Sequence, residues 1–226
     1  MRDILKRLRK KYGVIDTSEF IATHVRNRGL FEFIVGVMLS QNTSDRNAIA
    51  AYERLRRVLS SIAPESVLRA GMDTVSEAIK PAGMYRIRAK RIIELAELFS
   101  KPGFEYDLVK YISNASVEDA RKKLMELPGI GAKTADVVLL MYFGKPTFPV
   151  DTHIARITRR LGVVNKSDYE EIRRFWMNVF KPEEYLEAHL LLIIHGRRTC
   201  KARKPLCRYC VIRDYCREGA NPSHLN

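Results

Sequence analysis

Four cysteines lie close together in the last part of the chain. They are Cys200, Cys207, Cys210 and Cys216, spaced C-x6-C-x2-C-x5-C, and none of the 199 residues before them is a cysteine. The thiols therefore cannot cross-link distant parts of a fold, but they can surround one small metal centre. Zinc is the general candidate for such a centre, although zinc sites commonly pair two C-x2-C knuckles and this segment has only one.

A glycine-rich turn precedes a lysine in the middle of the chain. Residues 127–135 read Leu-Pro-Gly-Ile-Gly-Ala-Lys-Thr-Ala, with a helical pattern on each side. Gly129 and Gly131 permit a tight turn, and the backbone N–H groups at the start of the next helix suit a DNA phosphate. The simpler interpretation is a structural turn between two packed helices.

Lys133 falls in the first turn of the helix that follows these glycines. There the helix dipole and nearby basic residues disfavour the charged form of the amine, and an uncharged amine is a nucleophile. Such an amine can attack the anomeric carbon of a deoxyribose, expel the base and leave a Schiff base that promotes β-elimination. The alternative is a lysine that only pairs with a phosphate.

Asp151 stands directly before an apolar helical pattern, after a Gly-Lys-Pro loop. An aspartate in this position is typical of a helix N-cap. A carboxylate facing the same nucleotide as Lys133 can also accept a proton and stabilise a sugar that becomes positively charged as the base departs. The residues leave both interpretations open.

The elements that must position these groups are predicted to be helices. Apolar residues recur every three to four positions, as in Ala48, Tyr52, Leu55 and Leu59, and no stretch alternates as a strand would. Helix start and stop signals repeat along the chain, and they indicate about ten helices joined by short loops. We therefore expect an all-α fold.

The charge balance indicates a polyanionic partner. The 226 residues include 40 Lys and Arg against 26 Asp and Glu, a formal net charge of +14, which favours binding to nucleic acid. No apolar run approaches the roughly 20 residues of a spanning helix, and the first eleven residues are too charged for a signal peptide. We therefore expect no membrane partner and an intracellular location, cytoplasmic or associated with the nucleoid.

The segment from Leu127 to Asp151 resembles the helix-hairpin-helix, Gly/Pro loop and aspartate of the base-excision DNA glycosylases. The cysteine spacing is similar to that of the endonuclease III family within this group. The resemblance covers nearly the whole chain and implies one [4Fe-4S] cluster on the four cysteines. It also implies that Lys133 and Asp151 occupy the catalytic positions of the lyase-active members.

The resemblance further implies two helical lobes that flank a DNA-binding cleft. One is a six-helix module, residues 26–145, which contains the helix-hairpin-helix at about 117–143. The other is an iron-sulfur cluster lobe, residues 1–25 plus 146–226. Basic residues between the cysteines, including Lys201 and Arg203, are then expected to contact phosphates.

Family members also insert a polar side chain into the duplex where the target nucleotide has been extruded, which fills the gap that base flipping leaves. The corresponding loop here carries both Gln41 and Asn42. Asn42 occupies the position where the family pattern has glutamine, so either residue is a candidate. Met84 resembles a second, apolar wedge, and its alternative is a place in the core.

The function implied is a bifunctional DNA glycosylase and abasic-site lyase that removes oxidised pyrimidines such as thymine glycol from duplex DNA. Related mismatch glycosylases generally lack a lysine at the position of Lys133. A monofunctional glycosylase for G:T or G:U mismatches is one alternative. A non-catalytic DNA-binding module with structural metal is the other. Binding of one duplex in one cleft requires only one copy of the chain, so we expect a monomer.

Overall fold

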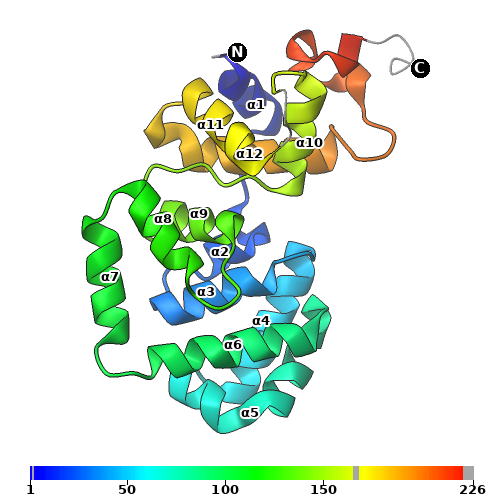
Figure 1. Ribbon diagram of the computed structural model, residues 1–226. Coiled ribbons are helices and arrows are strands. Elements are labelled where there is room, and N and C mark those ends of the chain that lie inside the picture. The colour runs from blue at the N-terminus through cyan, green and yellow to red at the C-terminus, as the bar shows by residue number, and fades with distance from the viewer. Residues whose placement is uncertain (2, 165–167, 221–226) are drawn as a thin grey trace. The chain divides into compact units, whose positions relative to one another are not determined.

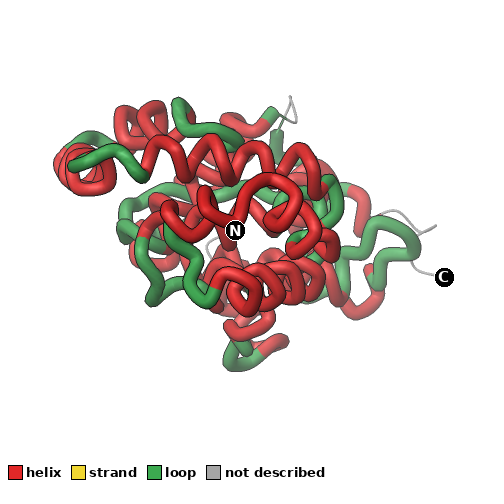
Figure 2. The backbone as a smooth tube through the Cα atoms, turned by 90° about the horizontal axis from the view of Figure 1, so that it is seen from below, coloured by secondary structure: helices red, strands yellow, loops and turns green. Residues whose placement is uncertain are grey.

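The regular elements of the protein are all helices. The computed structural model describes residues 1, 3–164 and 168–220, and no strand occurs in these ranges (Figure 1 and Figure 2). The all-α expectation is confirmed. The α-helices of the described chain are α1 (Ile4–Tyr12), α2 (Ile21–His24), α3 (Leu30–Leu39), α4 (Asp45–Leu59), α5 (Pro64–Ala78), α6 (Tyr85–Phe99), α7 (Phe104–Asn114), α8 (Val117–Met125), α9 (Ala132–Met141), α10 (Thr152–Leu161), α11 (Tyr169–Val179) and α12 (Tyr185–Arg198).

The contacts divide the chain into two units. The hairpin unit is Asp16–Lys145, and the cysteine unit combines Met1–Ile15 with the described residues from Pro146 onward. Residues 16–25, which we expected in the cluster lobe, belong to the hairpin unit, because α2 packs against α3, α4 and α9. Residues 2, 165–167 and 221–226 of the expected cluster lobe lie outside the described residues.

Helix α3 forms the centre of the hairpin unit. Its sequence is apolar on almost every side, and nine of its ten residues are buried. A helix that is apolar all round must be covered on all sides, and α2, α4, α6 and α9 supply that cover. Helix α6 also lies alongside α5 (Figure 1). The loop that carries Gln41 and Asn42 follows α3, and the loop that carries Met84 precedes α6.

The predicted helix-hairpin-helix is present as α8, a turn and α9. The Ser116 side chain caps α8 by accepting a hydrogen bond from the Asp119 amide, and Gly131 is the N-cap of α9. The two helices are joined by an ion pair in which Arg121 Nε lies 3.1 Å from an oxygen of the fully buried Asp136. Because a buried charge is unfavourable without its partner, this pair fixes how α9 lies against α8.

Gly129 allows the turn to lie directly on the rest of the hairpin unit. Its φ is +77°, and a Cβ atom added there would lie 2.9 Å from Cε of Met38 and 3.2 Å from Cβ of Arg91. Gly131, two residues later, has an extended backbone, with φ −97°. A Cβ atom on Gly131 would meet nothing within 4 Å. The two glycines of the motif therefore have different structural roles.

The cysteine unit is built around α12, which packs against α1 and α10. An aromatic cluster supports it, in which Phe148, Trp176 and Phe180 stack with ring centroids 5.3–6.2 Å apart. The indole N–H of Trp176 donates to the hydroxyl of Thr158, 2.8 Å away, and so ties α11 to α10. These contacts hold the start of α10, where Asp151 lies.

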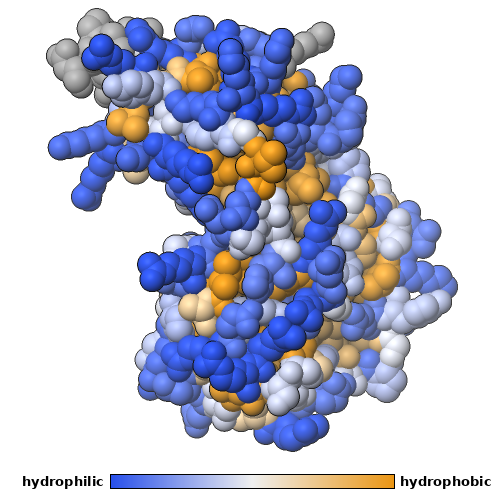
Figure 3. All heavy atoms as spheres, turned by 180° about the vertical axis from the view of Figure 1, so that it is seen from behind, coloured by the Kyte–Doolittle hydropathy of each residue, from blue (hydrophilic) through white to orange (hydrophobic). Residues whose placement is uncertain are grey.

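One face of the described chain is largely polar. Polar and charged side chains cover most of the face shown in Figure 3, with apolar residues visible between them. None of the described helices has the length and apolar character needed to cross a membrane.

We predict opposite effects of alanine at the two glycines of the turn. Gly129→Ala forces a side chain into the left-handed region and against Arg91, so it should lower the free energy of unfolding by about 1–3 kcal/mol. Gly131→Ala meets no such obstacle and should change it by less than about 0.5 kcal/mol. Urea denaturation of both variants is the measurement. Equal losses would contradict the packing described for Gly129.

Candidate functional site

Lys133 is placed by the hairpin turn. It is the second residue of α9 and is half-buried, and its ammonium has no hydrogen bond or ion pair within the described residues. The backbone N–H groups of the first turn of a helix have no partner inside that helix, so the amine stands beside unpaired donors. The structure therefore places Lys133 in the first helical turn, as the sequence predicted.

Asp151 is the N-cap of α10. Its carboxylate accepts a hydrogen bond of 2.8 Å from the backbone N–H of Ile154, and the N-cap interpretation is confirmed. One carboxylate oxygen is used in this way, and the side chain as a whole is half-buried. Asp151 belongs to the cysteine unit and Lys133 to the hairpin unit.

The start of α10 is fixed by close contact with α12. A Cβ atom on Gly196 would lie 2.6 Å from Cβ of His153, so only glycine lets the two helices approach this closely. Arg156 donates to the carbonyl oxygen of Gly196 and to Nδ1 of His153, both at 2.9 Å. Burial lowers the pKa of His153, which favours the neutral ring that accepts this bond. The backbone around Asp151 is therefore rigidly held.

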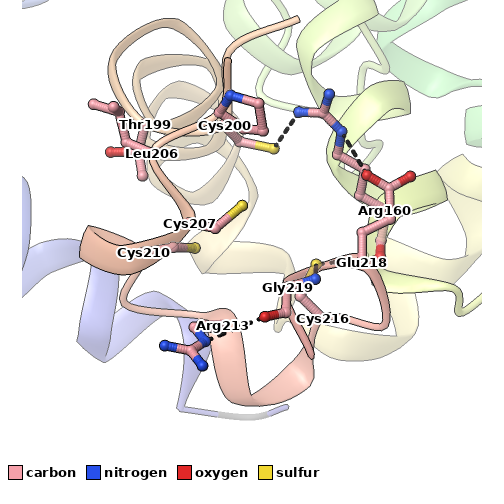
Figure 4. A pocket seen from close by; sticks show the side chains of 11 residues that line it. Arg160, Thr199, Cys200, Leu206, Cys207, Cys210, Arg213, Cys216, Glu218 and Gly219 are labelled. Atoms are coloured by element: carbon pink, nitrogen blue, oxygen red, sulfur yellow. Dashed lines mark hydrogen bonds and ion pairs between the residues drawn. The ribbon is translucent and has the colours of Figure 1, made fainter. Parts of the chain in front are cut away.

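All four cysteines line one pocket in the cysteine unit. Figure 4 shows their sulfur atoms around a common space, with Arg160 on the opposite side. The pocket is completed by residues from the segment that follows α12 and from the short 3-10 helices η4 (Cys207–Tyr209), η5 (Arg213–Tyr215) and η6 (Glu218–Ala220). No group of three or more His, Cys, Asp or Glu residues in the described chain is arranged to hold a single metal ion.

The chemistry of these thiols fits a centre that takes four thiolates. Burial raises the pKa of Cys210 to about 11, and it also raises the pKa values of Cys207 and Cys216. The neighbouring sulfurs act in the same direction, because clustered negative charges repel one another. These groups lose their protons readily only where positive charge is supplied, and a bound metal centre supplies it.

Arg160 and His195 contact the cysteine sulfurs, and the sequence analysis did not predict either contact. Arg160 Nη1 lies 3.3 Å from Cys200 Sγ, and its guanidinium also pairs with Glu218 at 3.0 Å. His195 is fully buried, with Nε2 3.5 Å from Cys210 Sγ. Burial lowers the pKa of His195 to about 4, so its ring is neutral at neutral pH. Both residues follow ordinary helical patterns, so nothing in the sequence singled them out.

Lys201 and Arg203 are exposed on the segment between the first two cysteines. Arg160 holds this segment by donating to the carbonyl oxygens of Lys201, at 2.7 Å, and Ala202, at 3.1 Å. The backbone beside the two basic residues is thus fixed, and their side chains are free to meet an anion. Their phosphate-binding role stays a prediction.

The structure distinguishes the two candidate wedge residues. Gln41 Nε2 donates to the carbonyl oxygen of Gly129, at 2.9 Å, and to the hydroxyl of Thr134, at 3.0 Å. Gln41 therefore ties its loop to the hairpin turn. Asn42 is exposed and has a left-handed backbone, with φ +54°. Of the two, Asn42 has the free side chain.

Met84 lies at the exposed tip of the loop before α6, as Asn42 does in the loop after α3. Its side chain is 57% exposed and its φ is +49°, so the alternative of a core residue is wrong. It is the N-cap residue of α6. Ile87, one turn further along α6, is likewise 57% exposed, so two large apolar residues are exposed at the start of this helix.

Comparison with known proteins identifies the family. Residues 35–182 match the model of the HhH-GPD superfamily base excision DNA repair protein. The chain belongs to this superfamily. It is 38% identical to endonuclease III of Sulfolobus acidocaldarius over 214 residues, which cover 93% of this chain and 92% of that protein.

Two solved structures of DNA glycosylases or endonucleases share the fold. A trapped endonuclease III–DNA covalent intermediate, an estranged-adenine complex, superposes with a TM-score of 0.77 at 30% identity and covers 96% of this chain and 94% of that one. A thermostable thymine-DNA glycosylase gives a TM-score of 0.75 at 19% identity, with 96% of each chain covered. The second likeness concerns the fold alone.

We predict that the capping role of Asp151 depends on an acceptor oxygen and not on charge. Asp151→Asn keeps such an oxygen and should change the free energy of unfolding by less than about 0.5 kcal/mol, whereas Asp151→Ala should lower it by about 0.5–2 kcal/mol. Chemical denaturation of both variants measures the difference. If the asparagine variant lost as much as the alanine variant, the cap would not be what holds the start of α10.

Proposed function

We propose that the protein is a bifunctional DNA glycosylase and abasic-site lyase of base excision repair, with Lys133 as the nucleophile. The observation that carries this proposal is the half-buried amine of Lys133 beside the turn of a helix-hairpin-helix. A related endonuclease III forms a covalent intermediate with DNA, which supports the same chemistry here. Since the substrate is DNA, the enzyme would act inside the cell.

The proposed reaction begins at the anomeric carbon of the damaged nucleotide. The uncharged amine of Lys133 attacks this carbon, the glycosidic bond breaks, and the base departs with the bonding electrons and acquires a proton. The Asp151 carboxylate accepts the proton that the attacking nitrogen loses, and it stabilises positive charge on the sugar. The sugar ring then opens, because the C1′–O4′ bond breaks and O4′ takes up a proton, which leaves a Schiff base between C1′ and the Lys133 nitrogen. This Schiff base acidifies C2′, and loss of the C2′ proton with β-elimination expels the 3′ phosphate.

Three segments of the hairpin unit supply the proposed DNA contacts. The backbone amides that follow Gly129 and Gly131 bind a phosphate at the start of α9. Asn42 enters the gap left by the extruded nucleotide, and Met84 inserts beside it as an apolar wedge. The oxidised pyrimidines, including thymine glycol, are the proposed substrates, because the family resemblance and the lysine at position 133 both favour them.

We also propose that the four cysteines hold one [4Fe-4S] cluster. Such a cluster is bound by four thiolates, and each of them binds a different iron atom, so the ligand sulfurs need not meet at a single ion. Bound there, it would supply a positively polarised core that stabilises the thiolates. The protein residues around it fix the segment that carries Lys201 and Arg203, and these two side chains contact phosphates.

The lyase proposal predicts a covalent adduct that depends on Lys133. Borohydride should trap the wild-type protein on a duplex containing one abasic site, because it reduces the Schiff base. Lys133→Ala should lose at least about 99% of the trapped product while keeping much of its DNA affinity. Lys122→Ala is the matched control: Lys122 is an exposed lysine of the same hairpin, and its loss should leave trapping unchanged.

Three results would contradict the lyase proposal. Full trapping by Lys133→Ala would show that another amine is the nucleophile. Absence of trapping by folded wild-type protein, with release of thymine from a G:T duplex, would indicate the monofunctional mismatch enzyme. Absence of both activities, with salt-sensitive DNA binding retained, would indicate a non-catalytic module.

The cofactor proposal predicts about four iron atoms and four inorganic sulfides per chain. The chain contains only four cysteines, so thiol titration reports on the ligands alone. We expect no reactive thiol in the native protein and four after oxidative removal of the iron, with the iron lost in Cys210→Ala. One zinc ion and no sulfide per chain would contradict the cluster.

A further inference from the structure

Arg88 is a buried charge whose partners are all backbone carbonyl groups. It lies in the first turn of α6 and is 4% exposed. Its guanidinium donates to the carbonyl oxygen of Met38, in the last turn of α3, and to that of Gln41, at 2.8 Å, in the loop that follows. It also donates to those of Ala82, at 3.4 Å, and Gly83, at 3.3 Å. No carboxylate of the described residues pairs with it.

Two of these carbonyl groups belong to the peptides that lead into the exposed loop tips. The carbonyl of Gln41 is part of the peptide that joins it to Asn42, and the carbonyl of Gly83 is part of the peptide that joins it to Met84. Both tip residues have left-handed backbones. Such conformations are uncommon in residues other than glycine and are least favourable for a large side chain such as that of Met84, so surrounding contacts help to maintain them. One guanidinium supplies such contacts to both tips.

Arginine is suited to this arrangement by its shape. The guanidinium offers five donors in a rigid plane, whereas a lysine offers three from one nitrogen atom. Burial lowers the pKa of Arg88 because desolvation disfavours its charge, but an arginine remains protonated in proteins. Its bonds to the carbonyl groups are therefore charge-assisted and stronger than those between neutral groups.

Helix α6 also supports the hairpin turn. The aliphatic stem of Arg91, three residues after Arg88, lies against Gly129. Of the neighbouring groups, only Met38 would come closer to a Cβ atom added at Gly129. Gln41 bonds to the carbonyl of Gly129 from the other side. The two loops and the hairpin turn are therefore held by one connected set of contacts within the hairpin unit.

We propose that Arg88 is a positioning residue that holds Asn42 and Met84 together, ready to enter the duplex at the extruded nucleotide. The proposal rests on the wedge roles given under the proposed function. Arg88 is too buried to act through DNA contact. Preformed tips do not have to be ordered during binding, so losing Arg88 should weaken recognition of the gap more than general binding to duplex DNA.

The test compares two dissociation constants. One is for an undamaged duplex and the other for the same duplex with a single tetrahydrofuran abasic analogue. The ratio of the dissociation constant for the undamaged duplex to that for the abasic duplex measures recognition of the gap. Partial unfolding does not change this ratio, because it lowers the concentration of active protein equally in both measurements. We expect Arg88→Met to lower the ratio at least tenfold. Arg88→Lys, which keeps the charge but cannot span both loops, should lower it at least threefold and serves if the methionine variant does not fold.

The matched control is Arg173→Met. Arg173 is another buried arginine, 3% exposed, which donates to Thr147 Oγ1 at 3.0 Å in the cysteine unit. Its loss should destabilise the protein but change the ratio less than twofold.

A second comparison adds Arg88→Met to the double variant Asn42→Ala/Met84→Ala. If Arg88 acts through the two tips, this addition should change the ratio less than twofold.

Three results would overturn the proposal. The first is a ratio that stays within twofold of wild type in both Arg88 variants. The second is a tenfold fall caused by Arg88→Met in the background that lacks both tips, because Arg88 would then act elsewhere. The third is a wild-type protein that does not distinguish the two duplexes. That result would overturn the proposed function as well, whereas the first two concern Arg88 alone.

Discussion

The close contact of the hairpin turn with α3 and α6 is the constraint on which the candidate site depends. A side chain at Gly129 would crowd Met38 and Arg91, so the turn lies directly on the two helices that bracket the exposed loops. Helix α9 starts from this fixed turn, and its second residue is Lys133. The position of the amine is therefore set by backbone packing.

Several residues of the site combine a structural role with a proposed chemical one. Asp151 caps α10 with one carboxylate oxygen, which fixes the orientation of the group and leaves it as an acceptor. Gln41 shows the opposite outcome, since its amide is used in bonds to Gly129 and Thr134. Its neighbour Asn42 is left exposed. A side chain already engaged in the fold is poorly suited to enter DNA, and this difference identifies the better wedge candidate.

The sequence was sufficient for the helical fold, the hairpin and the cysteine segment, because each depends on local signals such as periodicity, caps and spacing. It placed residues 16–25 in the wrong unit, because a four-residue helix has too little pattern to show what it packs against. The exposure of Met84 and the contacts of Arg88, Arg160 and His195 depend on which distant segments meet. Residue type alone does not encode such contacts, so only the structure shows them.

Lys133 is one amine among many in a strongly basic chain, so the proposed reaction depends first on its identity as the nucleophile. The most direct measurement is peptide mapping by mass spectrometry after borohydride reduction on an abasic duplex and nuclease digestion. We predict that the residual sugar mass is carried by Lys133, in the peptide that contains the start of α9. A modification on any other lysine, with Lys133 unmodified, would contradict it.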